Sequence, residues 1–185
     1  MGQARTMGEI DLIAAAERLP RERRAHLFGL LNGGLFLSHT TADAAVIRRH
    51  IEPVATAQFY GAFFFQNLSF PMAQEYEPLV GQALLSCRVL LVAVSAAALS
   101  SRYMKAELDV AIHRRMPTVV CRLDRTDPVQ LSPFLGRSWN PLRRRRVAFV
   151  DFSADTAQGR RRLEAVLARR SFRCTHSLAR EVPPE

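Results

Sequence analysis

The stretch SSRYMKAEL, residues 100–108, places the ring of Tyr103 four residues before the carboxylate of Glu107 on a predicted helix. Side chains four residues apart share one strip of a helix surface, and here that strip adjoins a predicted buried stripe. Glu107 either serves as a catalytic carboxylate facing a cleft, or forms a salt bridge to a neighbouring arginine while Tyr103 covers a sheet edge. The helix alone leaves both interpretations open. Its buried stripe consists of Met104, Leu108, Ala111 and Ile112.

A second polar group, Ser38, His39 and Asp43, contains the residue types of a hydrolase triad. Residues so close in sequence rarely converge into a triad, and the chain has no nucleophile elbow. The sequence also lacks a GxxxxGK[ST] phosphate loop and a GxGxxG after its first predicted strand. That strand does not end in the acidic pair of a phospho-receiver domain. We therefore interpret the three side chains as polar loop residues.

The bulk composition predicts one soluble globular domain. The chain has 185 residues, of which 48% are hydrophobic and 23% charged. No apolar run approaches the roughly 20 residues that span a bilayer, and the N-terminal stretch does not follow a signal-peptide pattern. The three cysteines are odd in number, widely spaced and unlike metal ligands. These features favour a reducing, cytoplasmic location without a membrane contact or a metal.

The net charge of +9 raises the hypothesis of nucleic-acid binding. Of the 26 basic residues, however, only Lys105 is a lysine, a bias more typical of a GC-rich genome than of phosphate recognition. The densest cluster, Arg143–Arg146, follows an Asn-Pro pair and precedes an apolar run, which indicates an exposed loop. No aromatic residues alternate with these arginines. A solvated loop is therefore favoured over a nucleic-acid site.

Apolar runs and helical patterns alternate along the chain and predict an α/β fold. A five-stranded parallel sheet with helices on both faces accounts for this alternation. Ligands collect at the carboxyl ends of such strands, so the loops at residues 38–43, 67–73 and 95–107 are the candidate site. Residues 1–33 read as an N-terminal helical extension, 34–170 as the domain and 171–185 as a tail. The strands are predicted near 35–38, 62–66, 88–94, 118–123 and 147–152.

Two stretches of the chain resemble sequence boxes of Toll/interleukin-1 receptor (TIR) domains. LFLSHTTAD, residues 35–43, is similar to the first box, F-[IL]-S-[HY]-x-x-x-D in bacterial members. VLLVAVSAAALSSRYMKAELDVAI, residues 89–112, resembles the block from the third strand into the next helix, with its Ser-x-[WY]-x-x-x-E-[LI] pattern. In that pattern Ser101, Tyr103, Glu107 and Leu108 hold the defined positions. The resemblance covers roughly residues 34–168 and implies a flavodoxin-like TIR fold.

The chain departs from the family pattern at two places. Tyr103 holds a position that is usually Trp, which keeps a flat ring and adds a hydroxyl group. The second box usually has an acidic residue after the second strand, followed by Pro-Gly. FQNLSFPMAQ, residues 65–74, instead offers Gln66, Asn67 and Pro71. The loop after the second strand therefore differs from the family pattern in both shape and charge.

The family resemblance implies two alternative activities. Some TIR domains cleave NAD⁺ between nicotinamide and ribose, as hydrolases or ADP-ribosyl cyclases, with the helix glutamate essential; others serve only as TIR–TIR interaction modules. The first alternative makes Glu107 the catalytic residue and NAD⁺ the substrate, with no further cofactor and no metal. The substrate-binding residues would then be Ser38, His39, Thr40, Asn67 and Tyr103.

The resemblance also implies partners. Many TIR enzymes work as homo-oligomers through TIR–TIR contacts, in which the loop after the second strand of one copy completes its neighbour's site. Short stand-alone members resemble the signal-producing subunits of Thoeris-type anti-phage systems. There a separate effector reads an ADP-ribose-derived product, either linear or cyclic. The chain has no second domain to act as that effector, which suits a small diffusible signal.

Overall fold

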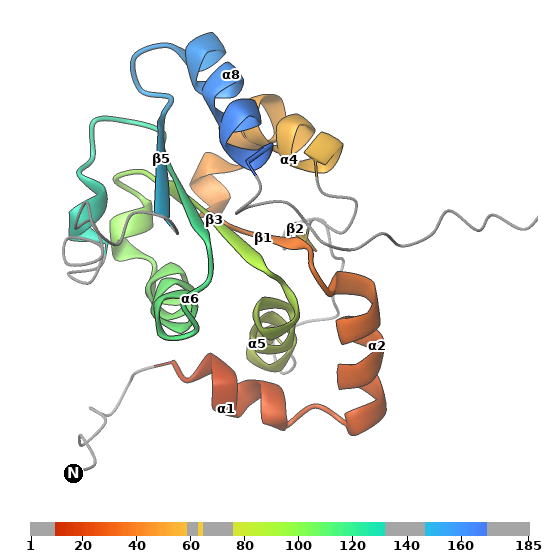
Figure 1. The fold of residues 1–185 in the computed structure, drawn as a ribbon. Helices are drawn as coiled ribbons and strands as arrows, with labels where there is room; N and C mark the ends of the chain where they lie inside the picture. Colours follow the sequence, from red (N-terminus) through yellow and green to blue (C-terminus); the bar gives the residue numbers. More distant parts are fainter. Residues whose placement is uncertain (1–9, 59–62, 65–75, 132–146, 170–185) are drawn as a thin grey trace, which may run out of the picture.

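The computed structural model describes residues 10–58, 63–64, 76–131 and 147–169. A parallel sheet forms its centre, with the strand order β2-β1-β3-β4-β5 (Figure 1). Its parallel pairing is the predicted arrangement, and the described part of β2 is only two residues long. The strands are β1 (Leu35–Ser38), β2 (Phe63–Phe64), β3 (Val89–Val94), β4 (Thr118–Arg122) and β5 (Val147–Asp151).

Helices cover both faces of the sheet, as predicted. One face packs against α5 (Tyr76–Ser86) and α6 (Arg102–His113), and the other against α4 (Glu52–Gln58) and α8 (Thr156–Leu167). Every residue of β3 is fully buried, because helices exclude water from both of its sides. Shorter helical elements in the described ranges include α3 (Ala44–Val46), a π-helix (Ile47–Ile51) and 3₁₀ turns at Thr41–Asp43, Ala98–Ser100 and Pro128–Gln130.

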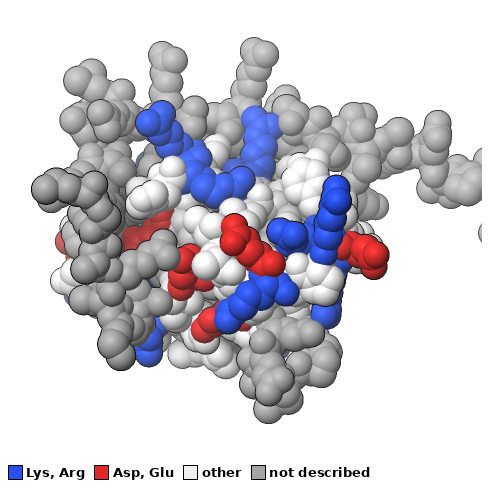
Figure 2. All heavy atoms as spheres, turned by 90° about the horizontal axis from the view of Figure 1, so that it is seen from below, with Lys and Arg blue, Asp and Glu red and all other residues white. Residues whose placement is uncertain are grey.

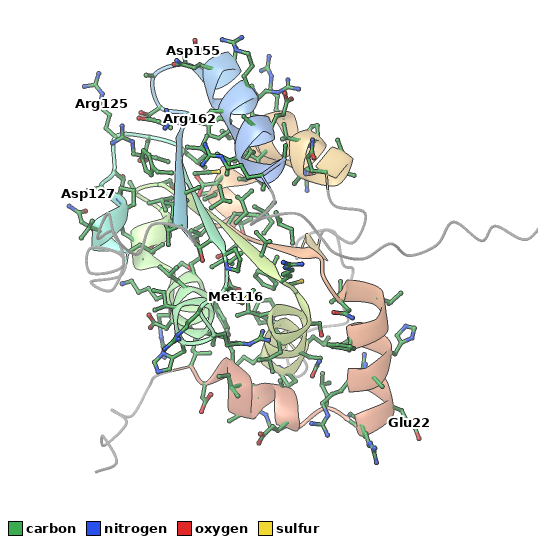
Figure 3. The ribbon with its side chains drawn as sticks, viewed as in Figure 1. Glu22, Met116, Arg125, Asp127, Asp155 and Arg162 are labelled. Atoms are coloured by element: carbon green, nitrogen blue, oxygen red, sulfur yellow. The ribbon has the colours of Figure 1, made fainter. Side chains whose placement is uncertain are left out.

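Side chains at the helix ends explain where the helices on the sheet begin and stop. The Ser101 hydroxyl accepts a hydrogen bond from the Met104 amide and so caps the start of α6. Asp155, labelled in Figure 3, caps α8 in the same way. Helix α6 ends at His113, since Arg115 takes a left-handed φ of 52° that no α-helix continues.

The N-terminal extension forms two helices, α1 (Leu12–Glu17) and α2 (Arg21–Leu31), which pack against α5 (Figure 1). Leu12 of α1 and Leu31 of α2 belong to the same hydrophobic core as Phe36 of β1. Both helices therefore bury apolar surface that α5 would otherwise expose to water.

The surface seen in Figure 2 carries arginine and lysine side chains interspersed with acidic and uncharged ones. The described basic side chains on this face do not form the continuous patch that would follow a phosphate backbone. The arginine cluster Arg143–Arg146 lies outside the described residues. Across the part of the chain that the structure describes, no helix combines the length and the hydropathy of a membrane span.

Candidate functional site

A cavity of about 580 Å³ opens at the carboxyl ends of β1 and β3, where the sheet topology predicts a ligand site. The end of β1 and the loop after it form one wall, and the turn before α6 forms the other. Of the predicted site residues, Ser38, His39, Thr40, Tyr103 and Glu107 all line this cavity, whereas Asn67 lies outside the described residues. Sequence reasoning missed Tyr76, which lines the cavity from the first turn of α5.

Glu107 lines the cavity with only 5% of its surface exposed. The Ser38 hydroxyl at the end of β1 donates a hydrogen bond of 2.5 Å to Glu107 Oε2. The alternative of a salt bridge to a neighbouring arginine is not found among the described residues, where Ser38 is the polar partner of this carboxylate. Glu107 is thus a buried carboxylate that faces a cavity rather than a solvated helix side chain.

Burial raises the pKa of Glu107 from 4.5 to about 7, against an opposing, smaller effect of the Ser38 hydrogen bond. The apolar surroundings disfavour the ionised form, whereas the hydroxyl donor favours it. A carboxyl group with a pKa near neutrality can change protonation state in the range where most enzymes work. Raised pKa values of this kind are frequent among catalytic acids and bases.

The raised pKa predicts how the stability of the protein changes with pH. Between about pH 4.5 and 7 the folded protein keeps a proton on Glu107 that the unfolded chain has lost, so stability falls as pH rises. Over this window, the free energy of unfolding of the wild type should fall by about 3 kcal/mol relative to Glu107→Gln. Urea titrations of both proteins from pH 4 to 8 measure this difference. A difference that does not change with pH would show that the pKa of Glu107 is not raised.

Two tyrosines from different helices meet at the cavity. The rings of Tyr76 and Tyr103 contact edge to face, with their centroids 4.9 Å apart and an interplanar angle of 74°. Burial, together with the charge of Glu107, raises the pKa of Tyr76, so its hydroxyl stays protonated at neutral pH. The pair gives the cavity an aromatic side close to its carboxylate. The sequence signal that could have identified Tyr76 is an aromatic residue at the start of the helix that follows the loop after β2.

Asp43 does not line the cavity but links its two walls through hydrogen bonds. Its Oδ2 accepts hydrogen bonds from the hydroxyls of Thr40, at 2.6 Å, and Ser95, at 2.8 Å. The Ser95 oxygen in turn accepts from the Ala98 amide in the turn that leads to α6. One carboxylate therefore fixes the loop after β1 relative to the end of β3.

The side chains Ser38, His39 and Asp43 do not form a hydrolase triad. Ser38 contacts Glu107, and His39 Nδ1 lies 3.0 Å from the backbone oxygen of Thr40. Asp43 holds Thr40 instead of orienting the histidine. Ser38 is the last residue of β1 and was wrongly interpreted as a loop residue, whereas His39 and Asp43 follow the strand. Ser38 and His39 line the cavity.

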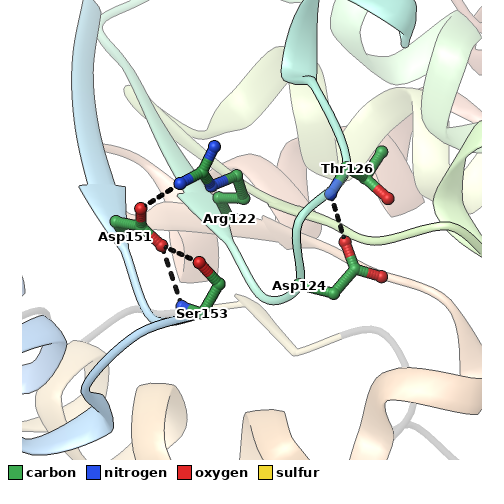
Figure 4. A network of polar contacts seen from close by, with 5 residues as sticks. All are labelled: Arg122, Asp124, Thr126, Asp151 and Ser153. Atoms are coloured by element: carbon green, nitrogen blue, oxygen red, sulfur yellow. Dashed lines mark hydrogen bonds and ion pairs between the residues drawn. The ribbon is translucent and has the colours of Figure 1, made fainter.

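A second polar network lies at the ends of β4 and β5, away from the cavity lining (Figure 4). Arg122 forms an ion pair with Asp151, which also accepts hydrogen bonds from Ser153. Burial opposes ionisation of Asp151, but the hydrogen bonds from Arg122 and Ser153 prevail and lower its pKa to about 2. Asp124 accepts the amides of Ala96 and Thr126. These carboxylates remain ionised and hold the strand ends together, so they are poor candidates for proton transfer.

The cavity combines three kinds of side chain. In the described ranges, no three His, Cys, Asp or Glu side chains gather as metal ligands would. What the cavity offers is one buried carboxylate, an aromatic pair and several hydroxyl groups. Such a set can stabilise a developing positive charge beside a flat ring system.

Comparison with known proteins places this geometry in a family. A family model described as the TIR domain matches residues 35–166, which include β1 to β5 and nearly all of α8. The match begins after α1 and α2. Neither the curated proteins nor the solved structures include one that matches the chain significantly.

Proposed function

The chain belongs to the TIR domain family, and we propose that it cleaves NAD⁺ at the bond between nicotinamide and ribose. Glu107 is the catalytic residue of this proposal. The observation that carries it is the position of Glu107, which is buried, is hydrogen-bonded to Ser38 and lines the same cavity as two tyrosine rings. Burial in a cavity with a raised pKa is typical of catalytic carboxylates rather than of glutamates on a protein surface.

The reaction fits a single carboxylate. When the bond between ribose C1′ and the nicotinamide nitrogen breaks, its electron pair goes to the nitrogen and nicotinamide leaves as a neutral molecule. Positive charge then develops on the ribose ring, as in glycoside hydrolysis, and the ionised Glu107 beside the ring stabilises it. Attack of water at C1′, with loss of a proton, gives ADP-ribose; attack by a nucleophile of the same molecule gives a cyclic product.

The tyrosine pair supplies the binding surface for a flat part of the nucleotide. We expect Tyr103→Ala to reduce kcat/KM by about tenfold through the loss of ring contact. Tyr103→Trp keeps a ring and loses only the hydroxyl, so its kcat/KM should fall by no more than about two- to fivefold. Steady-state cleavage of NAD⁺ by both variants measures this. Equal losses in the two variants would show that the hydroxyl, rather than the ring, matters.

The proposed biological role is the production of an ADP-ribose-derived signal in bacterial anti-phage defence, in homo-oligomers joined by TIR–TIR contacts. A separate effector would read the product. Mass spectrometry of nucleotides from cells expressing the wild type or Glu107→Gln, with and without phage, tests this role. The proposal predicts a new ADP-ribose derivative in infected wild-type cells and none with the variant. NAD⁺ levels and nucleotide spectra that are identical in all four samples would favour a non-catalytic interaction module.

A further inference from the structure

Helix α1 lies outside the matched family region, yet it packs tightly against the helix that carries Tyr76. Leu12 of α1 is 1% exposed, and Ala15 and Ala16 are also buried. At Gly81 of α5, an added Cβ would lie 2.0 Å from the Leu12 carbonyl oxygen, which no side chain permits. The close approach of the two backbones thus depends on Gly81. This contact fixes the position of α1 relative to α5, whose first turn carries Tyr76.

Polar contacts continue from α1 towards the cavity. Arg18, at the end of α1, donates to Glu77 Oε2 over 3.4 Å. The Tyr103 hydroxyl donates to the other oxygen, Glu77 Oε1, also over 3.4 Å. Glu77 itself does not line the cavity, whereas its neighbour Tyr76 and its partner Tyr103 both do. Glu77 therefore reaches the site through the Tyr103 hydroxyl and through its chain neighbour Tyr76.

We propose that Glu77 is a positioning residue, held from α1 by Arg18, that sets the Tyr76–Tyr103 ring pair for the nucleotide. The inference rests on the proposed function, because a preset ring pair matters only if the cavity binds a flat ligand. It also gives the N-terminal extension a role in substrate binding that the family match does not include.

The size of the effect follows from the exposure of the contacts. The side chains of Arg18 and Glu77 are 63% and 37% exposed, so water and salt weaken their attraction. Losing either contact should therefore weaken NAD⁺ binding by only about two- to fivefold. The chemical step should not change, since Glu107 and Ser38 contact neither residue.

The test measures KM and kcat for NAD⁺ with the purified full chain. The dissociation constant for NAD⁺ is measured by calorimetry with the same substitutions placed in the Glu107→Gln variant, so that NAD⁺ is not consumed. Glu77→Ala, Arg18→Ala and Tyr103→Phe should each raise KM about two- to fivefold at unchanged kcat. Glu77→Gln, whose amide oxygen can still accept from Tyr103, should lie closer to the wild type than Glu77→Ala. The double variant Glu77→Ala/Tyr103→Phe should be no worse than Tyr103→Phe, since both changes break one contact.

Matched controls are Glu22→Ala and Arg21→Ala, which alter exposed charges at the start of α2 and should leave KM and binding unchanged. Glu22 projects from the outer end of that helix in Figure 3. Thermal unfolding of every variant identifies any change that acts through stability alone.

The outcomes distinguish a failure of the positioning role from a failure of the proposed function. If the wild type cleaves NAD⁺ while Glu77→Ala keeps its KM, or the double variant shows additive losses, the positioning role is wrong and the proposed function stands. If the wild type binds NAD⁺ without cleaving it, the proposed function fails, and the binding constants of the Glu77, Arg18 and Tyr103 variants still decide the inference. If NAD⁺ does not bind at all, both are wrong.

Discussion

Glu107→Gln should reduce the rate of NAD⁺ cleavage at least a hundredfold. The amide has the size of the carboxylate and can still accept the Ser38 hydroxyl, but it carries no charge to stabilise the positive ribose ring. Removing one catalytic electrostatic contact typically costs two to three orders of magnitude in rate. Nicotinamide release by equal concentrations of the two purified proteins measures the loss.

The matched control for this substitution is Glu164→Gln, which makes the same chemical change on the exposed side of α8. Its rate should equal that of the wild type. Circular dichroism should show that both variants remain folded, and Glu107→Gln should be the more stable of the two above pH 7, where the wild type ionises a buried acid. A Glu107→Gln variant that cleaves NAD⁺ within a few-fold of wild type would show that another residue carries the reaction.

The second large effect is on pH dependence. Because the ionised form of Glu107 is the active one and its pKa is about 7, kcat/KM should fall tenfold for each pH unit below 7 and level off above it. At pH 5 the loss is about a hundredfold relative to the plateau. Rates measured from pH 5 to 9 at low substrate concentration give the profile of the free enzyme.

The direction of this pH profile distinguishes an effect of pH on catalysis from an effect of pH on folding stability. The contribution of Glu107 to stability increases towards low pH, where folded and unfolded states are both protonated, so its protonation does not unfold the protein. A loss of activity at pH 5 with intact circular dichroism therefore reports the carboxylate itself. A profile that is flat between pH 5 and 8, or that falls with increasing pH, would contradict an ionised Glu107 with a pKa near 7.

The sheet and several residues that line the cavity were predictable because their signals are local. Continuous apolar runs mark β3 and β4, which are buried on both faces, and their alternation with helical patterns predicts parallel pairing. The spacing of Tyr103 and Glu107 on one helix, and the polar residues directly after β1, needed only sequence periodicity and the family pattern. Because parallel strands end at one edge, Ser38 and Glu107 meet although 69 positions separate them.

Features that depend on contacts between distant segments could not be predicted. The hydrogen bond from the Ser95 hydroxyl to Asp43 joins residues 52 positions apart, and sequence periodicity does not predict it. Tyr76 reaches the cavity only because α5 begins beside α6. The docking of α1 depends on the absence of a side chain at Gly81, which the sequence shows only as a glycine in a helix.

The most direct test is the incubation of purified wild-type protein with NAD⁺, at high protein concentration and with a crowding agent to promote assembly. Proton NMR follows free nicotinamide, and Glu107→Gln runs in parallel under the same conditions. NAD⁺ cleavage by a TIR domain with Glu107 as its catalytic carboxylate predicts that nicotinamide accumulates with the wild type, faster than linearly with protein concentration, and stays at background with the variant. Intact NAD⁺ with both proteins, or equal nicotinamide release from both, would contradict it.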